Sequence, residues 1–212
     1  MLDKIYVFDD IINLDYQNKI KSILTEEALH NNKYFPWYFI GDITASDSGN
    51  QKRRAFTHQY VDYDVGVMSD FHDLFVDLIK VSCSKINVEE VDVYQGRSFL
   101  QLASNIKKED VDSPHVDMPH QHFVVLYYVC DSDGDTIIYD KKCETFKEFE
   151  NMINSNTKTF NIQRKITPKQ GRVVLFNGLL YHTAEQPNKD IRCIVNYYNL
   201  RDLSKVVEGV RI

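Results

Sequence analysis

The sequence lacks the motifs of several common protein classes. Its eight glycines are too far apart to form a G-x-G-x-x-G or Walker-type phosphate loop, which argues against a nucleotide-dependent α/β enzyme. No apolar run reaches the roughly 18 to 20 residues needed to cross a bilayer. The four cysteines contain no C-x-x-C pair, so we expect neither a zinc ribbon nor a disulfide-stapled secreted domain. We interpret all four as small buried side chains.

An excess of positive charge is also missing. The chain has 25 Lys and Arg against 31 Asp and Glu, a net charge of −6. Such a chain has little electrostatic attraction for phosphate backbones or anionic lipids, so we expect neither a nucleic acid nor a membrane as a partner. The N-terminal residues MLDKIYVFDD carry acids where a signal peptide has an apolar stretch. We therefore expect a cytoplasmic protein.

Apolar residues, by contrast, are plentiful. They make up 43% of the 212 residues and extend along the whole chain. At this length, folding buries roughly 70% of the surface of the unfolded chain, so a well-packed core is expected. No change in composition marks a linker. We therefore predict a single domain over residues 1–212.

The hydrophobic period changes along the chain. Helical spacing predicts helices over about 14–29, 67–85 and 145–153. From Val91 onward, short segments rich in β-branched and aromatic residues predict strands over 91–94, 99–105, 122–130, 136–139, 159–166, 172–176 and 191–200. The predicted class is α+β with a mainly β core. Residues 1–90 would supply supporting helices and a loop at the pocket edge, and residues 91–212 would form a sandwich or barrel.

Three other segments have simple structural interpretations. The aromatic cluster YFPWYFI at 34–40 predicts packing between the first helices and the β core, with Trp37 or Tyr38 on a pocket wall as the alternative. The polar stretch 46–54 predicts an exposed loop, able to act as a lid, with the basic run at 52–54 at its tip. The acidic segment DSDGD at 131–135 departs from the EF-hand template and predicts a hairpin turn.

The chemistry is concentrated in the second half of the chain. His115 and Asp117 are two residues apart, so in an extended segment they lie on the same face. This pair alone carries little weight, because seven histidines among 31 acids in 212 residues give about one such pair by chance. His182, which follows an apolar strand, completes a set of two imidazoles and one carboxylate. That set is typical of non-haem Fe(II) sites with open coordination positions.

Two neighbouring histidines are rivals for the third position. His120 and His122 are closer to the pair in sequence than His182 is. Pro119 interrupts the strand there, and a ligand from a separate strand completes the triad better, so we rank them second. His120 could instead lie at the mouth of the pocket.

Arg192 opens a strand that is otherwise made of Cys, Ile, Val and Tyr. A guanidinium cannot lose its proton, and its burial is unfavourable unless an anion contacts it. A dicarboxylate with one end on the metal and the other on Arg192 would account for both the metal-binding set and the arginine in an apolar strand.

Several motifs, in this order, resemble the Fe(II)/2-oxoglutarate-dependent oxygenase family, prolyl-hydroxylase type. They are HVD at 115–117, LYYV at 126–129, ITPKQGRVVLF at 166–176, HTAEQP at 182–187 and RCIVNYY at 192–198. The segments FLQLASNI at 99–106, YFPWYFI and RCIVNYYNL more loosely resemble small family members from phages and marine microbes.

The resemblance implies a double-stranded β-helix, or jelly-roll, and an enzyme that hydroxylates a C–H bond with O2 and releases succinate and CO2. It implies Fe(II) on His115, Asp117 and His182. It also implies 2-oxoglutarate as cosubstrate, with its distal carboxylate on Arg192 and Tyr128. Asn105, ten residues before His115, matches a position that often helps to fix the cosubstrate. Asn196, four residues after Arg192 on the same strand face, could do similar work.

The sequence departs from the family at two places and leaves the substrate open. Ile194 stands where many members have a serine, and the segment before Thr136 keeps the usual pattern only in part. A protein side chain and a small molecule both remain candidates. Two alternative functions are a cupin-like metal enzyme without 2-oxoglutarate and a non-catalytic interaction protein on the same fold; neither requires a buried carboxylate-binding arginine.

Overall fold

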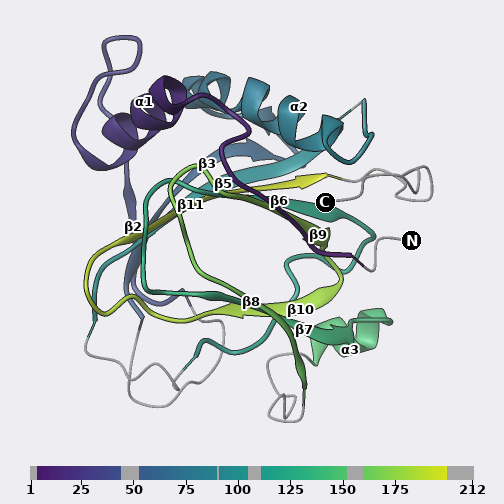
Figure 1. Cartoon of the computed structure of the whole chain (residues 1–212). Coiled ribbons are helices and arrows are strands. Elements are labelled where there is room, and N and C mark those ends of the chain that lie inside the picture. Colours follow the sequence, from purple (N-terminus) through teal and green to yellow (C-terminus); the bar gives the residue numbers. More distant parts are fainter. Residues whose placement is uncertain (1–3, 44–52, 90, 105–110, 152–159, 200–212) are drawn as a thin grey trace.

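Two facing β-sheets form the centre of the protein. The N-terminal helices cover the outer face of the larger sheet, and the short helix at 146–150 lies beside the smaller sheet (Figure 1). The computed structural model describes residues 4–43, 53–89, 91–104, 111–151 and 160–199. Its helices are α1 (Leu14–Thr25), the 3-10 helix η1 (Asp70–Leu74), α2 (Val76–Ser84) and α3 (Phe146–Glu150). None of the described helices is long and apolar enough to span a bilayer.

All strand pairs are antiparallel, and the chain passes back and forth between the sheets from β6 onward. The eight-stranded sheet has the order β1 (Tyr6–Phe8), β9 (Val173–Asn177), β6 (Phe123–Tyr128), β11 (Arg192–Asn199), β5 (Val93–Gln101), β3 (Ala55–Asp62) and β2 (Tyr38–Ile40), with β4 (Gly66–Val67) beside β3. The three-stranded sheet has the order β10 (Leu180–Ala184), β7 (Thr136–Lys142) and β8 (Ile162–Ile166).

The central strands of the large sheet are buried on both faces. On β6, Val125 and Tyr127 pack toward the helices, whereas Val124, Leu126 and Tyr128 belong to the cluster between the two sheets. This two-sided burial explains why β6 reads as an uninterrupted apolar run. Helices α1, η1 and α2 form the layer outside the large sheet. The face between the two sheets carries the polar groups of the site.

The predicted class, mainly β with N-terminal helices, is confirmed, but several boundaries differ. The first helix is capped by the side chain of Asn13 and ends at Thr25. The predicted second helix begins later, because Ser69 caps η1 and the exposed Met68 lies outside the apolar stripe. Strands β1, β2, β3, β4 and β10 were not predicted.

Strand β5 is continuous, whereas the sequence analysis predicted a break within it. Gly96 allows the strand to pass under the ring of Tyr197, since a Cβ at this position would lie 2.2 Å from a ring carbon. The next residues, Arg97 and Ser98, are polar and therefore interrupt the apolar pattern. All four cysteines are free and buried, as predicted.

Phe75 connects the helical layer to the sheet, and its loss should destabilise the fold. Its ring is fully buried, with its centroid 4.8 Å from that of Tyr60 and 6.1 Å from that of Tyr197. We expect Phe75→Ala to lower the free energy of unfolding by about 3–5 kcal/mol, as for other large-to-small core substitutions. Tyr34, which is 67% exposed, provides the control. Tyr34→Ala should change the free energy of unfolding, measured by urea denaturation, by no more than about 0.5 kcal/mol. Similar losses for the two variants would contradict this assignment.

Candidate functional site

His115 and His182 are held next to each other by backbone pairing. The segment before β6 runs antiparallel to the free edge of β10, and His115 forms an isolated bridge with His182. Each amide donates to the other residue's carbonyl at 2.9 Å. A further bond from the Asp112 amide to the Ala184 carbonyl extends this pairing. The two imidazoles come together as a result, with ring centroids 4.8 Å apart.

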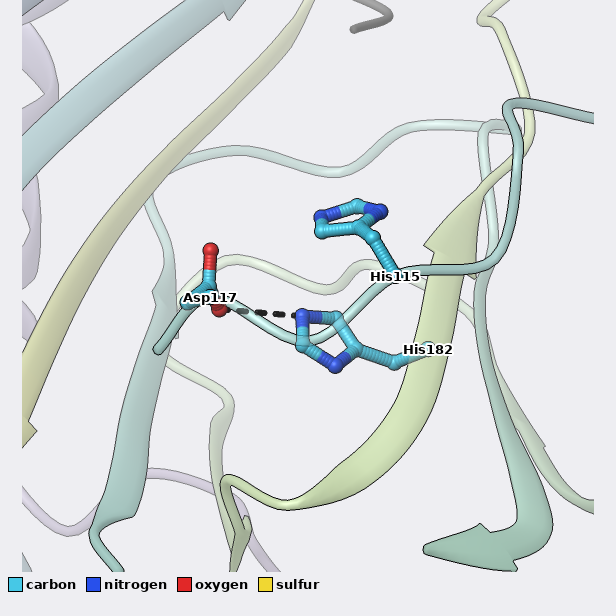
Figure 2. A group of neighbouring side chains, drawn as sticks. All are labelled: His115, Asp117 and His182. Carbon is cyan, nitrogen blue, oxygen red and sulfur yellow. Dashed lines mark ion pairs between the residues drawn. The ribbon is translucent and has the colours of Figure 1, made fainter. Parts of the chain in front are cut away.

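Asp117 joins the histidines because of strand alternation. Val116 is buried in a separate apolar cluster, whereas the side chains on either side of it point toward His182 (Figure 2). Donor atoms of His115, Asp117 and His182 all lie within 4.8 Å of one another. The structure therefore brings together the three residues that the sequence analysis selected as metal ligands.

The hydrogen bonds of the two histidines leave the correct nitrogens free. His115 Nδ1 lies 3.1 Å from the Ser113 carbonyl, and His182 Nδ1 lies 3.0 Å from the Leu180 carbonyl. A carbonyl only accepts, so each Nδ1 carries the proton and each Nε2 has a lone pair for a metal.

The third ligand atom is Asp117 Oδ2. It is buried, no described residue donates a hydrogen bond to it, and it lies 3.1 Å from His182 Nε2 without hydrogen-bond geometry. Two ligand atoms that are about 2.1 Å from one ion and at right angles lie about 3 Å apart, so this spacing fits a shared metal ion.

The surroundings favour the metal-binding forms of Asp117 and His115. Burial alone would raise the pKa of Asp117, but His182 and the Arg97 guanidinium outweigh it and hold the pKa well below its usual range. Burial lowers the pKa of His115, and the adjacent His182 lowers it further. The pKa of His182 is raised, because contact with Asp117 outweighs the effect of burial. An ionised carboxylate and a neutral imidazole are the forms that coordinate metals, so a metal that binds His182 displaces a proton that Asp117 otherwise favours there.

The rival histidines lie outside this group. His120 is exposed and does not line the cavity described below. His122 is fully buried, and its Nε2 packs against Gly178, where a Cβ would lie 2.0 Å away. In the part of the chain that the structure describes, the only metal-binding group of this kind is the one formed by His115, Asp117 and His182.

Arg192 lies on β11, is only 3% exposed and faces the same cavity. Its Nε donates to the Gly134 carbonyl at 2.9 Å, Nη1 donates to Gln101 Oε1 at 2.8 Å, and Nη2 donates to Thr136 Oγ1 at 2.8 Å. These bonds use three of its five N–H groups. Among the described residues, no carboxylate forms an ion pair with it. Burial is the main influence on the pKa of Arg192 and lowers it.

The partners of Arg192 present further hydrogen-bond donors. Thr136 Oγ1 accepts from Arg192 and also from the Tyr128 hydroxyl, at 2.7 Å, so its own proton is free to donate. Arg192 has no acceptor, which orients the Gln101 amide with its oxygen toward Arg192 and its Nε2 away. Among the described residues, that Nε2 has no acceptor. The result is a buried set of donors around a positive charge, which favours an anion.

A cavity of about 430 Å³ connects the metal-binding group with Arg192. Gln101, Thr136 and Asn196 line it, and the buried Oδ1 of Asn196 has no hydrogen-bond partner among the described residues. Tyr128 lies behind Thr136 and does not line the cavity. Asn105 falls outside the described residues, so its predicted contact with the cosubstrate is not tested.

Other parts of the rim differ from the sequence analysis. Ile40, Asp42 and Ile43 line the cavity, whereas Trp37 and Tyr38 do not. Trp37 donates to the Leu24 carbonyl at 3.0 Å and so joins the first helix to the sheet, which agrees with the packing prediction. The 131–135 segment is not a hairpin turn, because β6 and β7 belong to different sheets. It instead supplies the Gly134 carbonyl to Arg192.

Arg53 is not at a solvated loop tip. It is only 6% exposed, and its Nη1 forms an ion pair with Asp112, which is 7% exposed. Gln186 donates to both carboxylate oxygens of Asp112, at 3.0 and 3.1 Å. The charge was misassigned because a basic run in sequence does not reveal a buried acid 59 residues away. Only Arg54 is exposed, and Lys52 lies outside the described residues.

Removal of the Arg53 side chain should destabilise the protein strongly. Arg53→Met leaves Asp112 as a buried charge with only an amide partner, and a broken buried pair costs about 3–5 kcal/mol. Arg54→Met is the matched control and should change stability by no more than about 0.5 kcal/mol. Urea denaturation of both variants measures the difference. Equal, small effects would show that the buried ion pair does not stabilise the fold.

Metal binding should depend on His182 and not on His122. We expect His182→Ala to reduce Co(II) affinity at least a hundredfold, because it removes one of three ligands, in an anaerobic titration followed by absorption. His122→Ala removes a buried ring whose Nε2 faces Gly178, so Co(II) affinity should stay within about threefold once folding is verified by circular dichroism. Loss of Co(II) binding in His122→Ala together with retention in His182→Ala would reverse the assignment.

The sequence matches no protein-family model, and no curated protein sequence matches it. Solved structures do resemble the fold. An oxidoreductase of the 2OG-Fe(II) oxygenase family from Burkholderia pseudomallei has a TM-score of 0.63 and 11% identity, with 93% of this chain and 85% of that chain covered.

Two further structures give the same indication. HygX from Streptomyces hygroscopicus, with nickel, 2-oxoglutarate and hygromycin B bound, has a TM-score of 0.54 and 11% identity over 94% of this chain and 83% of that chain. A prolyl hydroxylase from Trichoplax adhaerens, in complex with a hypoxia inducible factor peptide fragment, has a TM-score of 0.53 and 10% identity. The match covers 97% of this chain and 87% of that chain. This chain therefore has the fold of the 2-oxoglutarate and Fe(II) oxygenases.

Proposed function

We propose that the protein is an Fe(II)- and 2-oxoglutarate-dependent dioxygenase that hydroxylates a C–H bond of a protein side chain or a small molecule. The observation that carries the proposal is the buried Arg192, which has no carboxylate partner among the described residues and faces the cavity that holds His115, Asp117 and His182. A metal site alone would not require this cation. A ligand with a metal-chelating end and a distal carboxylate accounts for both.

In this proposal His115, Asp117 and His182 hold Fe(II), because their free Nε2 and Oδ2 atoms match its preferred ligands. Arg192 binds the distal carboxylate of 2-oxoglutarate, together with the Thr136 hydroxyl and the Gln101 amide. Tyr128 acts behind Thr136 by fixing its hydroxyl. Asn196 and Asn105 are further candidates for contact with the cosubstrate.

The bound metal and cosubstrate supply the oxidising chemistry: O2 and 2-oxoglutarate convert a C–H bond to C–OH and yield succinate and CO2. The chain orients these partners and keeps water away. Leu126, Phe176 and Ile194 line the cavity with apolar surface, which lowers the local dielectric and strengthens the contact of Arg192 with a carboxylate.

The fold and the order of the motifs support membership of the same oxygenase family, prolyl-hydroxylase type. We interpret the two sheets as a double-stranded β-helix, since the chain crosses repeatedly between them from β6 to β11. We also propose that the whole chain is one domain, because β1 pairs with β9 and β3 pairs with β5 across long stretches of sequence. A cytoplasmic location remains part of the proposal.

The test is an anaerobic titration of the metal-free protein with Fe(II) and then with 2-oxoglutarate, followed by visible absorption. The proposal predicts a metal-to-ligand charge-transfer band that saturates with one equivalent of 2-oxoglutarate. If Fe(II) binds and no band forms, a cupin-like metal site without this cosubstrate becomes the better account. If neither binds, the protein is a non-catalytic member of the fold.

Arg192 should determine cosubstrate affinity without affecting the metal. Arg192→Met removes a charge-assisted contact worth about 1.5–3 kcal/mol, so we expect 2-oxoglutarate affinity to fall about 10- to 100-fold and Fe(II) affinity to stay unchanged. Arg164, an exposed arginine on β8 outside the cavity lining, is the control. Anaerobic isothermal titration calorimetry measures the Fe(II) affinity with metal-free protein and the 2-oxoglutarate affinity with Co(II)-loaded protein. Unchanged 2-oxoglutarate affinity in Arg192→Met would contradict the role of this residue.

A further inference from the structure

A second arginine, Arg97, lies in the same cavity but next to the metal-binding group. It is on β5, directly opposite Asn196 of β11. Its Nη2 donates to Asp117 Oδ1 at 2.9 Å and to the Tyr198 hydroxyl at 2.9 Å, and its Nε donates to the same hydroxyl at 3.3 Å. This arginine thus touches one of the three candidate ligands directly.

The guanidinium of Arg97 is held in one orientation. Its central carbon lies 5.0 Å from the ring centroid of Phe99 and 5.3 Å from that of Tyr198. The aromatic faces restrain the planar group, and the Tyr198 hydroxyl restrains two of its nitrogens. Since lysine has a single nitrogen on a flexible stem, it could not make the same set of contacts.

The two oxygens of Asp117 therefore have different surroundings. Oδ1 accepts from Arg97, whereas Oδ2 receives no hydrogen bond from the residues that the structure describes and lies 3.1 Å from His182 Nε2. The Asp117 side chain is only 5% exposed, so both contacts are shielded from bulk solvent. One oxygen is held toward β5, and the other faces the histidines.

We propose that Arg97 is a positioning residue that makes Asp117 bind the metal through one oxygen only. This inference rests on the proposed function. Carboxylates can bind a metal through one or both oxygens. A second Asp117 oxygen on the metal would take a position that the keto acid or O2 requires, so the contact with Arg97 keeps the site open for the cosubstrate.

The experiment compares wild type and Arg97→Met, both loaded with Co(II), by X-ray absorption spectroscopy and by calorimetric titration with 2-oxoglutarate. We expect a carboxylate bound through one oxygen in the wild type and through both oxygens in the variant. We expect the dissociation constant for 2-oxoglutarate to rise at least tenfold. Arg172→Met is the matched control, because Arg172 also pairs with an acid, Asp9, but does not line the cavity.

An identical carboxylate signature and a change of less than threefold in 2-oxoglutarate affinity would overturn the inference. Loss of Co(II) binding in a folded variant would also overturn it, since Asp117 would then need Arg97 to reach the metal at all. If Arg97→Met does not fold, Tyr198→Phe removes the hydroxyl that orients Arg97 and should shift both readouts in the same direction; no shift would contradict the proposal. The spectroscopic readout needs no 2-oxoglutarate, so a wild type that fails to bind the cosubstrate refutes the proposed function and leaves the role of Arg97 separately measurable.

Discussion

The candidate site depends on a pair of reciprocal backbone hydrogen bonds between His115 and His182. These bonds join the segment before β6 to the edge of the small sheet, and they bring together residues 67 positions apart in the chain. Backbone pairing fixes the separation of two side chains far more tightly than loop packing does, because it determines both register and facing. Strand alternation then places Asp117 on the same side, with Val116 buried in the apolar cluster on the other.

The large sheet contributes the second half of the site by the same alternation. Along β11, Arg192, Ile194 and Asn196 face the cavity, while Cys193, Val195 and Tyr197 pack toward the helices. The helical layer is therefore more than an outer cover. Because it buries one face of these strands, it fixes which residues face the cavity. A charged side chain can therefore lie at a defined place in the interior. Arg192 and Arg97 are both placed in this way, on neighbouring strands. The surroundings of Arg192 suit binding of a carboxylate ligand, and those of Arg97 suit orientation of Asp117.

Sequence order alone was sufficient to select His115, Asp117 and His182 and to identify Arg192 as a cation in need of an anion. The structure brings these four residues around one cavity, and their ligand roles remain predictions. Gln101 and Thr136 were missed as partners of Arg192, because their importance depends on which residue of one strand lies opposite which residue of another. A single sequence does not contain that register. Arg97 was hidden for the same reason, within a strand that the polarity of its residues made look like a break.

The burial of Arg53 and His122 shows a further limit of reading local patterns. Both are polar in sequence, and both are buried by partners or packing that lie far along the chain, Asp112 for Arg53 and Gly178 for His122. The fold class was easier to predict, because hydrophobic period is a local property and persists over many residues.

The most direct measurement is a crystal structure of the Co(II) form grown anaerobically with 2-oxoglutarate. The account predicts Co(II) on His115, Asp117 and His182, the keto acid on the metal, and the distal carboxylate within hydrogen-bond distance of Arg192 and Thr136. A metal bound by His122, or a 2-oxoglutarate molecule whose distal carboxylate does not contact Arg192, would contradict it.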